Sequence, residues 1–143
     1  MVCPSYPNII YAAASHTIFK STDAGNTWSA LHNNMGFPTG DFQITCLAVN
    51  PVNAGALMVT FGGYNEHIKV FYSYDGGINW DNVGADLPNV PVNCVVLNAD
   101  NSAYIGTDDG VYYQSASDIR WLPFYNGLPR VPVSDLVVYP SVY

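Results

Sequence analysis

Positive charge is scarce in this 143-residue chain. Lys and Arg together number 4 against 11 Asp and Glu, which gives a formal net charge of −7 at pH 7. Nucleic acids and anionic membrane surfaces are bound by clustered Lys and Arg. The composition therefore argues against both kinds of partner and leaves neutral or cationic partners open.

Long apolar runs and helical patterns are also missing. No run approaches the roughly 20 residues of a membrane-spanning helix, and the N-terminus lacks the basic and apolar pattern of a signal peptide. Apolar residues show no helical spacing, and Gly or Pro interrupts nearly every stretch of ten. The three cysteines, Cys3, Cys46 and Cys94, are too few for a disulfide framework.

A repeated motif is present instead. Residues 21–28 read S-T-D-A-G-N-T-W and residues 73–80 read S-Y-D-G-G-I-N-W, so both copies follow S-x-D-x-G-x-x-W. A third copy ends in Trp121 but has lost its Ser, its Asp and its second Gly, which are replaced by Gln114, Ala116 and Asp118. The third motif has decayed although its Trp remains.

The motif suits the turn of a β-hairpin. Ser and Asp can accept hydrogen bonds from backbone N–H groups, Gly allows positive φ, and Trp begins the returning strand and buries a large ring. We therefore predict a structural role for the motif residues, which are Ser21, Asp23, Gly25, Trp28, Ser73, Asp75, Gly77, Trp80 and Trp121.

A second repeat consists of apolar, β-branched segments at 44–51, 92–98 and 133–140, each preceded by a loop with Pro. Cys46 and Cys94 hold the same place in two of these segments, which predicts buried, inert thiols. The motif tryptophans are 52 and 41 residues apart. Four short strands in a period of about 40 to 50 residues indicate a β-propeller blade.

The predicted fold class is all-β, with one propeller segment over 1–143. It contains about three four-stranded antiparallel blades, and a typical ring needs 4 to 8. We therefore expect an incomplete ring that is part of a longer propeller, or a ring completed by oligomerisation. The first blade is expected to lack its innermost strand. The unpaired C-terminal strand would complete a first blade, its own or that of a neighbouring copy, and two chains would form a six-bladed ring. The predicted boundaries are blade A at 2–36, blade B at 42–86, blade C at 91–127 and an unpaired inner strand at 132–140.

The motif resembles the Asp-box, or BNR repeat, of sialidase-like, sortilin-like and xyloglucanase-like β-propellers. The resemblance covers essentially the whole chain and implies that the boxes lie on outer hairpins, away from the central channel where ligands bind. Sialidases need three converging arginines, whereas this chain has only Arg120 and Arg130. A sialidase site within this segment is therefore not expected.

The G-L-P and V-x-D-L-V-V-x-P phrases are similar to those of xyloglucanase-like glycosidases, which need two carboxylates across a cleft. Asp41, in a loop before one inner strand, and Asp135, at the start of another, are the candidates. The alternative is that they are a solvated loop residue and a strand-start cap.

No metal or cofactor is expected, because His16, His32 and His67 show no ligand spacing and the Asp108-Asp109-Gly110 stretch is typical of a hairpin turn. The loop at 61–67 is longer than its counterparts. It offers Tyr64, Glu66 and His67 as ligand-loop candidates.

Two functional hypotheses follow. The first is a non-catalytic scaffold or binding segment of a secreted or cell-surface protein, with a glycan or a protein as ligand. The second is a fragment of a glycan-cleaving hydrolase whose catalytic carboxylates lie wholly or partly outside this segment. A low Lys content with abundant Tyr, Asn, Ser and Gly favours an extracellular location.

Overall fold

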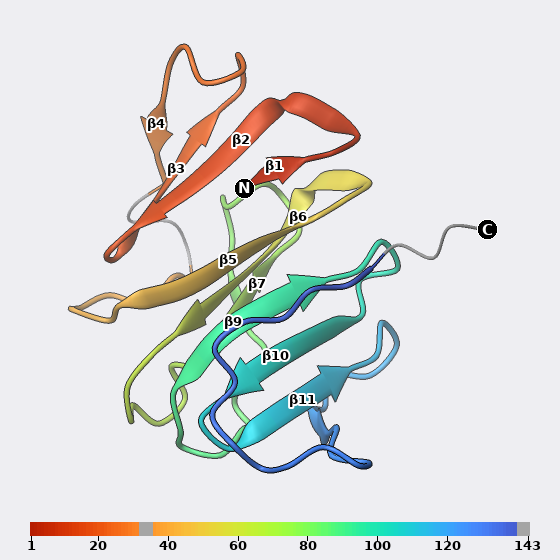
Figure 1. The fold of residues 1–143 in the computed structure, drawn as a ribbon. Coiled ribbons are helices and arrows are strands. Elements are labelled where there is room, and N and C mark those ends of the chain that lie inside the picture. The colour runs from red at the N-terminus through yellow and green to blue at the C-terminus, as the bar shows by residue number, and fades with distance from the viewer. Residues whose placement is uncertain (32–35, 140–143) are drawn as a thin grey trace.

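A computed structural model describes residues 1–31 and 36–139, which form three four-stranded antiparallel sheets (Figure 1). The prediction of an all-β chain with about three blades of an incomplete propeller is confirmed. None of the described residues forms a helix that is long and apolar enough to cross a membrane. The first sheet contains β1 (Val2–Cys3), β2 (Tyr6–Ala14), β3 (Thr17–Ser21) and β4 (Ser29–Ala30); the second, β5 (Ile44–Asn50), β6 (Asn53–Phe61), β7 (Val70–Ser73) and β8 (Asp81–Asn82); the third, β9 (Val92–Leu97), β10 (Ala103–Thr107), β11 (Gly110–Gln114) and β12 (Leu122–Pro123).

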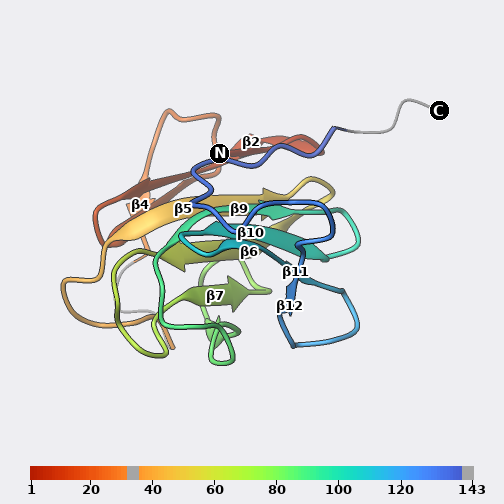
Figure 2. The same ribbon diagram turned by 60° about the horizontal axis from the view of Figure 1, so that its bottom comes forward.

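The sheets pack against one another face to face, and the apolar cores lie between them (Figure 2). One core joins the first and second sheets and includes Tyr11, Leu57 and Trp80. The other joins the second and third sheets and includes Met58, Ile105 and Trp121. Since no sheet carries a complete core of its own, the three sheets stabilise one another.

The first sheet repeats the pairing register of the second. Val2 pairs with Ile10 and Cys3 with Tyr6, as Val49 pairs with Leu57 and Asn50 with Asn53. The expectation that the first blade lacks its inner strand is therefore corrected in detail. Its last two residues form β1, while Ala12–Ala14 of β2 pair with β3 alone among the described residues.

Residues 133–139 run beside β9 without joining a sheet (Figures 1 and 2). The Val133 N–H donates to the Thr107 carbonyl at 2.9 Å, and the Asn93 side chain donates to the Val133 carbonyl at 3.2 Å. Val137 is 76% exposed and Tyr139 90% exposed. Pro140, the end of the predicted inner strand, lies outside the described residues.

The two intact S-x-D-x-G-x-x-W motifs, called box turns below, share their main hydrogen bonds. In the second, the Ser73 hydroxyl accepts from the Gly77 N–H at 2.9 Å. The Asp75 carboxylate accepts from the Asn79 N–H at 2.9 Å, and the Trp80 indole N–H donates to the Gly77 carbonyl at 3.1 Å. Gly77 has a φ of 89°, a conformation that favours glycine.

The first box turn repeats these bonds through its own residues. The Ser21 hydroxyl accepts from Gly25 at 2.9 Å, the Asp23 carboxylate accepts from Thr27 at 2.8 Å, and Trp28 donates to the Gly25 carbonyl at 3.1 Å. Ser and Asp therefore stabilise the turn, in the role that the motif predicts.

The third turn, at 114–121, has a different set of bonds. Gln114 donates its side-chain N–H to the Ile119 carbonyl at 2.7 Å. The Trp121 indole donates to the Val83 carbonyl of the second sheet at 2.7 Å, and the Trp121 N–H donates to the Asp86 carboxylate at 2.9 Å. The decayed turn therefore depends on the neighbouring sheet for bonds that the intact turns make internally.

The tryptophans differ in burial. Trp80 is 4% exposed and Trp121 5% exposed, but Trp28 is 45% exposed, which corrects the expectation that every motif Trp is buried. The reason is positional, because each later Trp packs in a core shared with the preceding sheet and no sheet precedes the first among the described residues. Trp80 also makes an edge contact with Phe37, with ring centroids 5.2 Å apart.

Replacing Trp80 with Ala should destabilise the fold far more than the same change at Trp28. Truncating a buried Trp costs about 3–5 kcal/mol, whereas Trp28 is already half exposed and should cost less than half of that. The free energy of unfolding in urea, measured for both variants, tests this. Equal losses would contradict packing of the second box turn between sheets.

Acidification should weaken the box turns. Hydrogen bonds from the Asn79 backbone and side chain lower the pKa of Asp75 from 3.8 to about 2, and bonds from Thr27 lower that of Asp23 equally. A lowered pKa in the folded state gives stability that is present above about pH 4 and is lost as pH falls toward 2.

The Asp75→Asn variant should therefore be less stable at pH 7 and show a smaller loss of stability between pH 4 and pH 2. Urea unfolding at each pH measures this slope. The exposed Asp41, which accepts no hydrogen bond from the described residues, provides the control Asp41→Asn. An identical pH slope in the Asp75 variant and the wild type would contradict the assignment.

Candidate functional site

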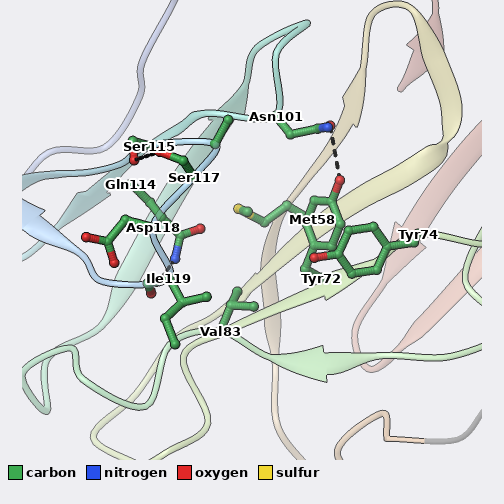
Figure 3. A pocket seen from close by; sticks show the side chains of 11 residues that line it. Met58, Tyr72, Tyr74, Val83, Asn101, Gln114, Ser115, Ser117, Asp118 and Ile119 are labelled. Atoms are coloured by element: carbon green, nitrogen blue, oxygen red, sulfur yellow. Dashed lines mark hydrogen bonds between the residues drawn. The ribbon is translucent and has the colours of Figure 1, made fainter.

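A pocket of about 200 Å³ opens between the second and third sheets. It lies beside the second box turn and the decayed third turn, at the far end of β7 from the β6–β7 loop (Figure 3). The second sheet and its turn supply Met58, Tyr72, Tyr74 and Val83, and the third sheet supplies Asn101, Gln114, Ser115, Ala116, Ser117, Asp118 and Ile119.

The corresponding space between the first and second sheets is closed by glycines. A Cβ added to Gly76 would lie 2.8 Å from the Lys20 ammonium nitrogen. A Cβ added to Gly77 would lie 2.7 Å from Leu31. Only residues without a side chain allow the second box turn to approach the first sheet this closely.

The third turn carries side chains at both of these positions. Aligned on the tryptophans, Ser117 and Asp118 take the places of Gly76 and Gly77. Leu31 of the first sheet and Val83 of the second hold equivalent positions. The Leu31 N–H donates to the Ile18 carbonyl as the Val83 N–H donates to the Val70 carbonyl. Side chains at these two positions therefore explain why the third turn leaves a pocket beside the second sheet.

Two tyrosines form one wall of the pocket. Their ring centroids are 4.3 Å apart with the planes at 66°, and Tyr74 is 69% exposed. Tyr72 is buried and donates its hydroxyl to Asn101 at 3.1 Å. Burial raises the pKa of Tyr72 to about 12, so it remains a neutral donor at physiological pH.

The opposite wall is polar and rich in acceptors. Asp118 pairs with Arg120 at 2.7 Å, and the bonds from Arg120 lower the pKa of that carboxyl, which is therefore ionised at neutral pH. Gln114 donates to Ile119 through its amide nitrogen, and the described residues give its amide oxygen no donor. The pocket combines aromatic faces with acceptors, which suits the binding of a small group.

The predicted ligand loop lies elsewhere, in the connection between β6 and β7. Tyr64, Glu66 and His67 are all exposed there. Two side chains hold the loop by hydrogen bonds. Lys69, which is 1% exposed, donates to the Gly63 carbonyl at 2.8 Å, and Asn82 donates to the His67 carbonyl at 2.6 Å. Desolvation lowers the pKa of Lys69.

The candidate carboxylates lie at the same end of the sheets as the β6–β7 connection. Asp41 precedes β5, and Asp135 follows the Val133 contact with the β10–β11 hairpin. Both are exposed, and neither lines the pocket. Within the described part of the chain, Asp135 accepts only from the adjacent Leu136 N–H, at 2.9 Å.

Cys94 lies near Asp135 and is 4% exposed. Burial raises the pKa of its thiol to about 11. Cys46 is only partly buried. The prediction of two buried thiols is therefore confirmed for Cys94 and wrong for Cys46. All three cysteines are free thiols.

No group of three His, Cys, Asp or Glu side chains that could hold a metal occurs within residues 1–31 and 36–139. The hairpin carboxylates already have partners, because Asp109 pairs with Arg130 and Asp108 accepts from Asn93 at 2.9 Å. His32 lies outside the described residues.

Sequence reasoning identified the decay of the third motif but not the pocket that results from it. The available signal was the pair Ser117 and Asp118 at glycine positions. Its meaning depended on contacts of Gly76 and Gly77 with the preceding sheet, which spacing along the chain does not reveal.

Comparison with known proteins gives one related sequence and several related folds. No protein-family model matches the chain. Vacuolar protein sorting/targeting protein 10 of Komagataella phaffii is 32% identical over 92 residues, which are 62% of this chain and 5% of that protein.

Two solved structures share the architecture. The GH74 xyloglucanase of Xanthomonas campestris has a TM-score of 0.68 and 14% identity, over 87% of this chain and 21% of that one. YCF48 bound to D1 peptide has a TM-score of 0.61 and 17% identity, over 85% of this chain and 42% of that one.

The chain thus spans less than half of each of these proteins, and the low identities to the solved structures establish the fold alone. The three face-to-face sheets and these similarities lead to one conclusion: this chain is part of a β-propeller.

Proposed function

We propose that this chain is a non-catalytic scaffold and binding segment of a secreted or cell-surface propeller protein, with a glycan or a protein as its ligand. The observation that carries the proposal is the pocket between the second and third sheets. Its walls offer aromatic rings, hydroxyls and amides. Asp118, its one carboxylate, is already paired with Arg120.

The similar proteins support this proposal without deciding it. The propeller fold occurs both in a xyloglucanase and in YCF48, whose structure holds a peptide. Function depends on the site rather than on the fold. The name of the sorting and targeting protein adds weight to a binding role.

A glycoside hydrolase fragment is the second candidate. The similarity to the xyloglucanase fold favours it, as does the place of Asp135 at the start of the segment that resembles an inner strand. Hydrolysis needs two carboxyl groups about 5 Å apart for retention, or about 6.5–9.5 Å apart for inversion. Under this alternative, at least one of them is supplied from outside the segment.

We also propose that a second copy of the chain can complete the first sheet. Ala12–Ala14 of β2 have no ladder partner on the β1 side among the described residues. Residues 133–139 resemble the inner strands in sequence and have no ladder partner of their own. Exposed strand edges of this kind accept an added strand through main-chain hydrogen bonds.

The chain alone should hydrolyse neither xyloglucan nor other β-glucans. Release of reducing sugar measures this, with the Asp41→Asn and Asp135→Asn variants as matched controls. Turnover that falls at least about 100-fold in either variant would overturn the non-catalytic proposal, since losing a catalytic carboxylate costs about that much.

Light scattering should give the mass of two copies. Val137→Pro should shift the mass to one copy, because Pro removes a backbone N–H that a new strand pair needs. Val137 is exposed, so the folded monomer should tolerate the change, and Val137→Thr serves as the strand-compatible control. A folded, monodisperse wild-type monomer would defeat the second-copy proposal.

A further inference from the structure

The space that corresponds to the pocket, between the first and second sheets, contains a cation from the chain itself. The Lys20 ammonium nitrogen lies 5.5 Å from the centroid of the Tyr11 ring. It also lies against Gly76 of the second box turn. A cation over an aromatic ring is stabilised by the ring's negative face, so this interface places an ammonium beside a box turn.

The sheet register makes the comparison with the pocket direct. Lys20 pairs with Ser29, and Tyr72 pairs with Asp81 in the same register of the second sheet. Tyr72 therefore replaces Lys20, and by the same alignment Met58 replaces Tyr11. The pocket has no lysine of its own among its lining residues, and aromatic faces and acceptors surround the open space.

Charge near the pocket favours a cation. Asp118 lines the pocket. Asp86 accepts from the Trp121 N–H at the end of the third turn, and Asp75 comes directly after the lining residue Tyr74. Arg120 is the only Lys or Arg paired with these carboxylates in the described part of the chain. The whole chain carries a net charge of −7, so a cation gains attraction that a neutral ligand does not.

We propose that the pocket binds a primary ammonium group, carried by a lysine side chain of a protein partner or by a free alkylamine. The alkyl stem lies along Met58 and Val83. The ammonium lies against the Tyr72 and Tyr74 rings and donates to the Gln114 amide oxygen, which faces the tyrosines across the pocket (Figure 3). This specifies the ligand of the binding role proposed above.

An NMR titration with N-acetyl-lysine N-methylamide tests the proposal, with N-acetyl-norleucine N-methylamide as the neutral probe of similar shape. The lysine probe should shift the backbone amide signals of Tyr74, Ser117 and Ile119, and the norleucine probe should not. Raising the salt concentration from about 0.05 M to 0.5 M should weaken the lysine interaction, because salt screens exposed charges.

Two variants locate the interaction. Tyr74→Ala should weaken lysine binding about two- to fivefold, the usual share of an exposed cation–π contact. Tyr64→Ala is the matched control, since Tyr64 is 68% exposed but lies in the loop at the other end of β7. Tyr72→Lys should place an internal ammonium in the pocket, as Lys20 does in its own interface, and abolish binding.

The two sources of the ammonium are separated by a lysine-containing peptide. Binding at least tenfold tighter than that of the lysine derivative identifies a protein partner, and equal affinity identifies a free amine. Equal shifts with norleucine, shifts with methyl glucoside alone, or no shifts with lysine would each overturn the ammonium proposal. None of these results alters the glycan hydrolysis test, so the two proposals fail separately.

Discussion

The structure depends on the close approach of the second box turn to the first sheet. The three sheets share their cores pairwise, and the second box turn closes one shared core because Gly76 and Gly77 carry no side chains. Trp80 lies within that same core. The propeller motif is therefore a device for joining neighbouring sheets as well as for shaping a hairpin.

Loss of the device at the third turn changes the chemistry of the molecule. Ser117 and Asp118 stand where the second box turn has glycines, and a pocket with tyrosine, amide and carboxylate groups lies beside them. Trp121 keeps the sheets together by donating to the Val83 carbonyl. The fold thus tolerates a decayed repeat, and the tolerated gap is the place where a ligand fits.

Much of the fold could be predicted from the sequence because it repeats. The spacing of the three tryptophans predicted three sheets, and the S-x-D-x-G-x-x-W pattern predicted turns stabilised by Ser and Asp. The exposure of Trp28 could not be predicted from the motif, because burial depends on a neighbouring sheet. The pocket was missed for the same reason: Ser117 matters only through what Gly76 contacts in another interface.

A double-mutant cycle between Gly77→Ala and Leu31→Ala, followed by urea unfolding, tests the central claim most directly. A methyl group at Gly77 would lie 2.7 Å from Leu31, and its positive φ adds strain of its own that both backgrounds share. The account predicts that Gly77→Ala costs less in the Leu31→Ala background, with a coupling of about 0.5–3 kcal/mol. Strict additivity of the two losses would contradict closure of the first interface by the second box turn.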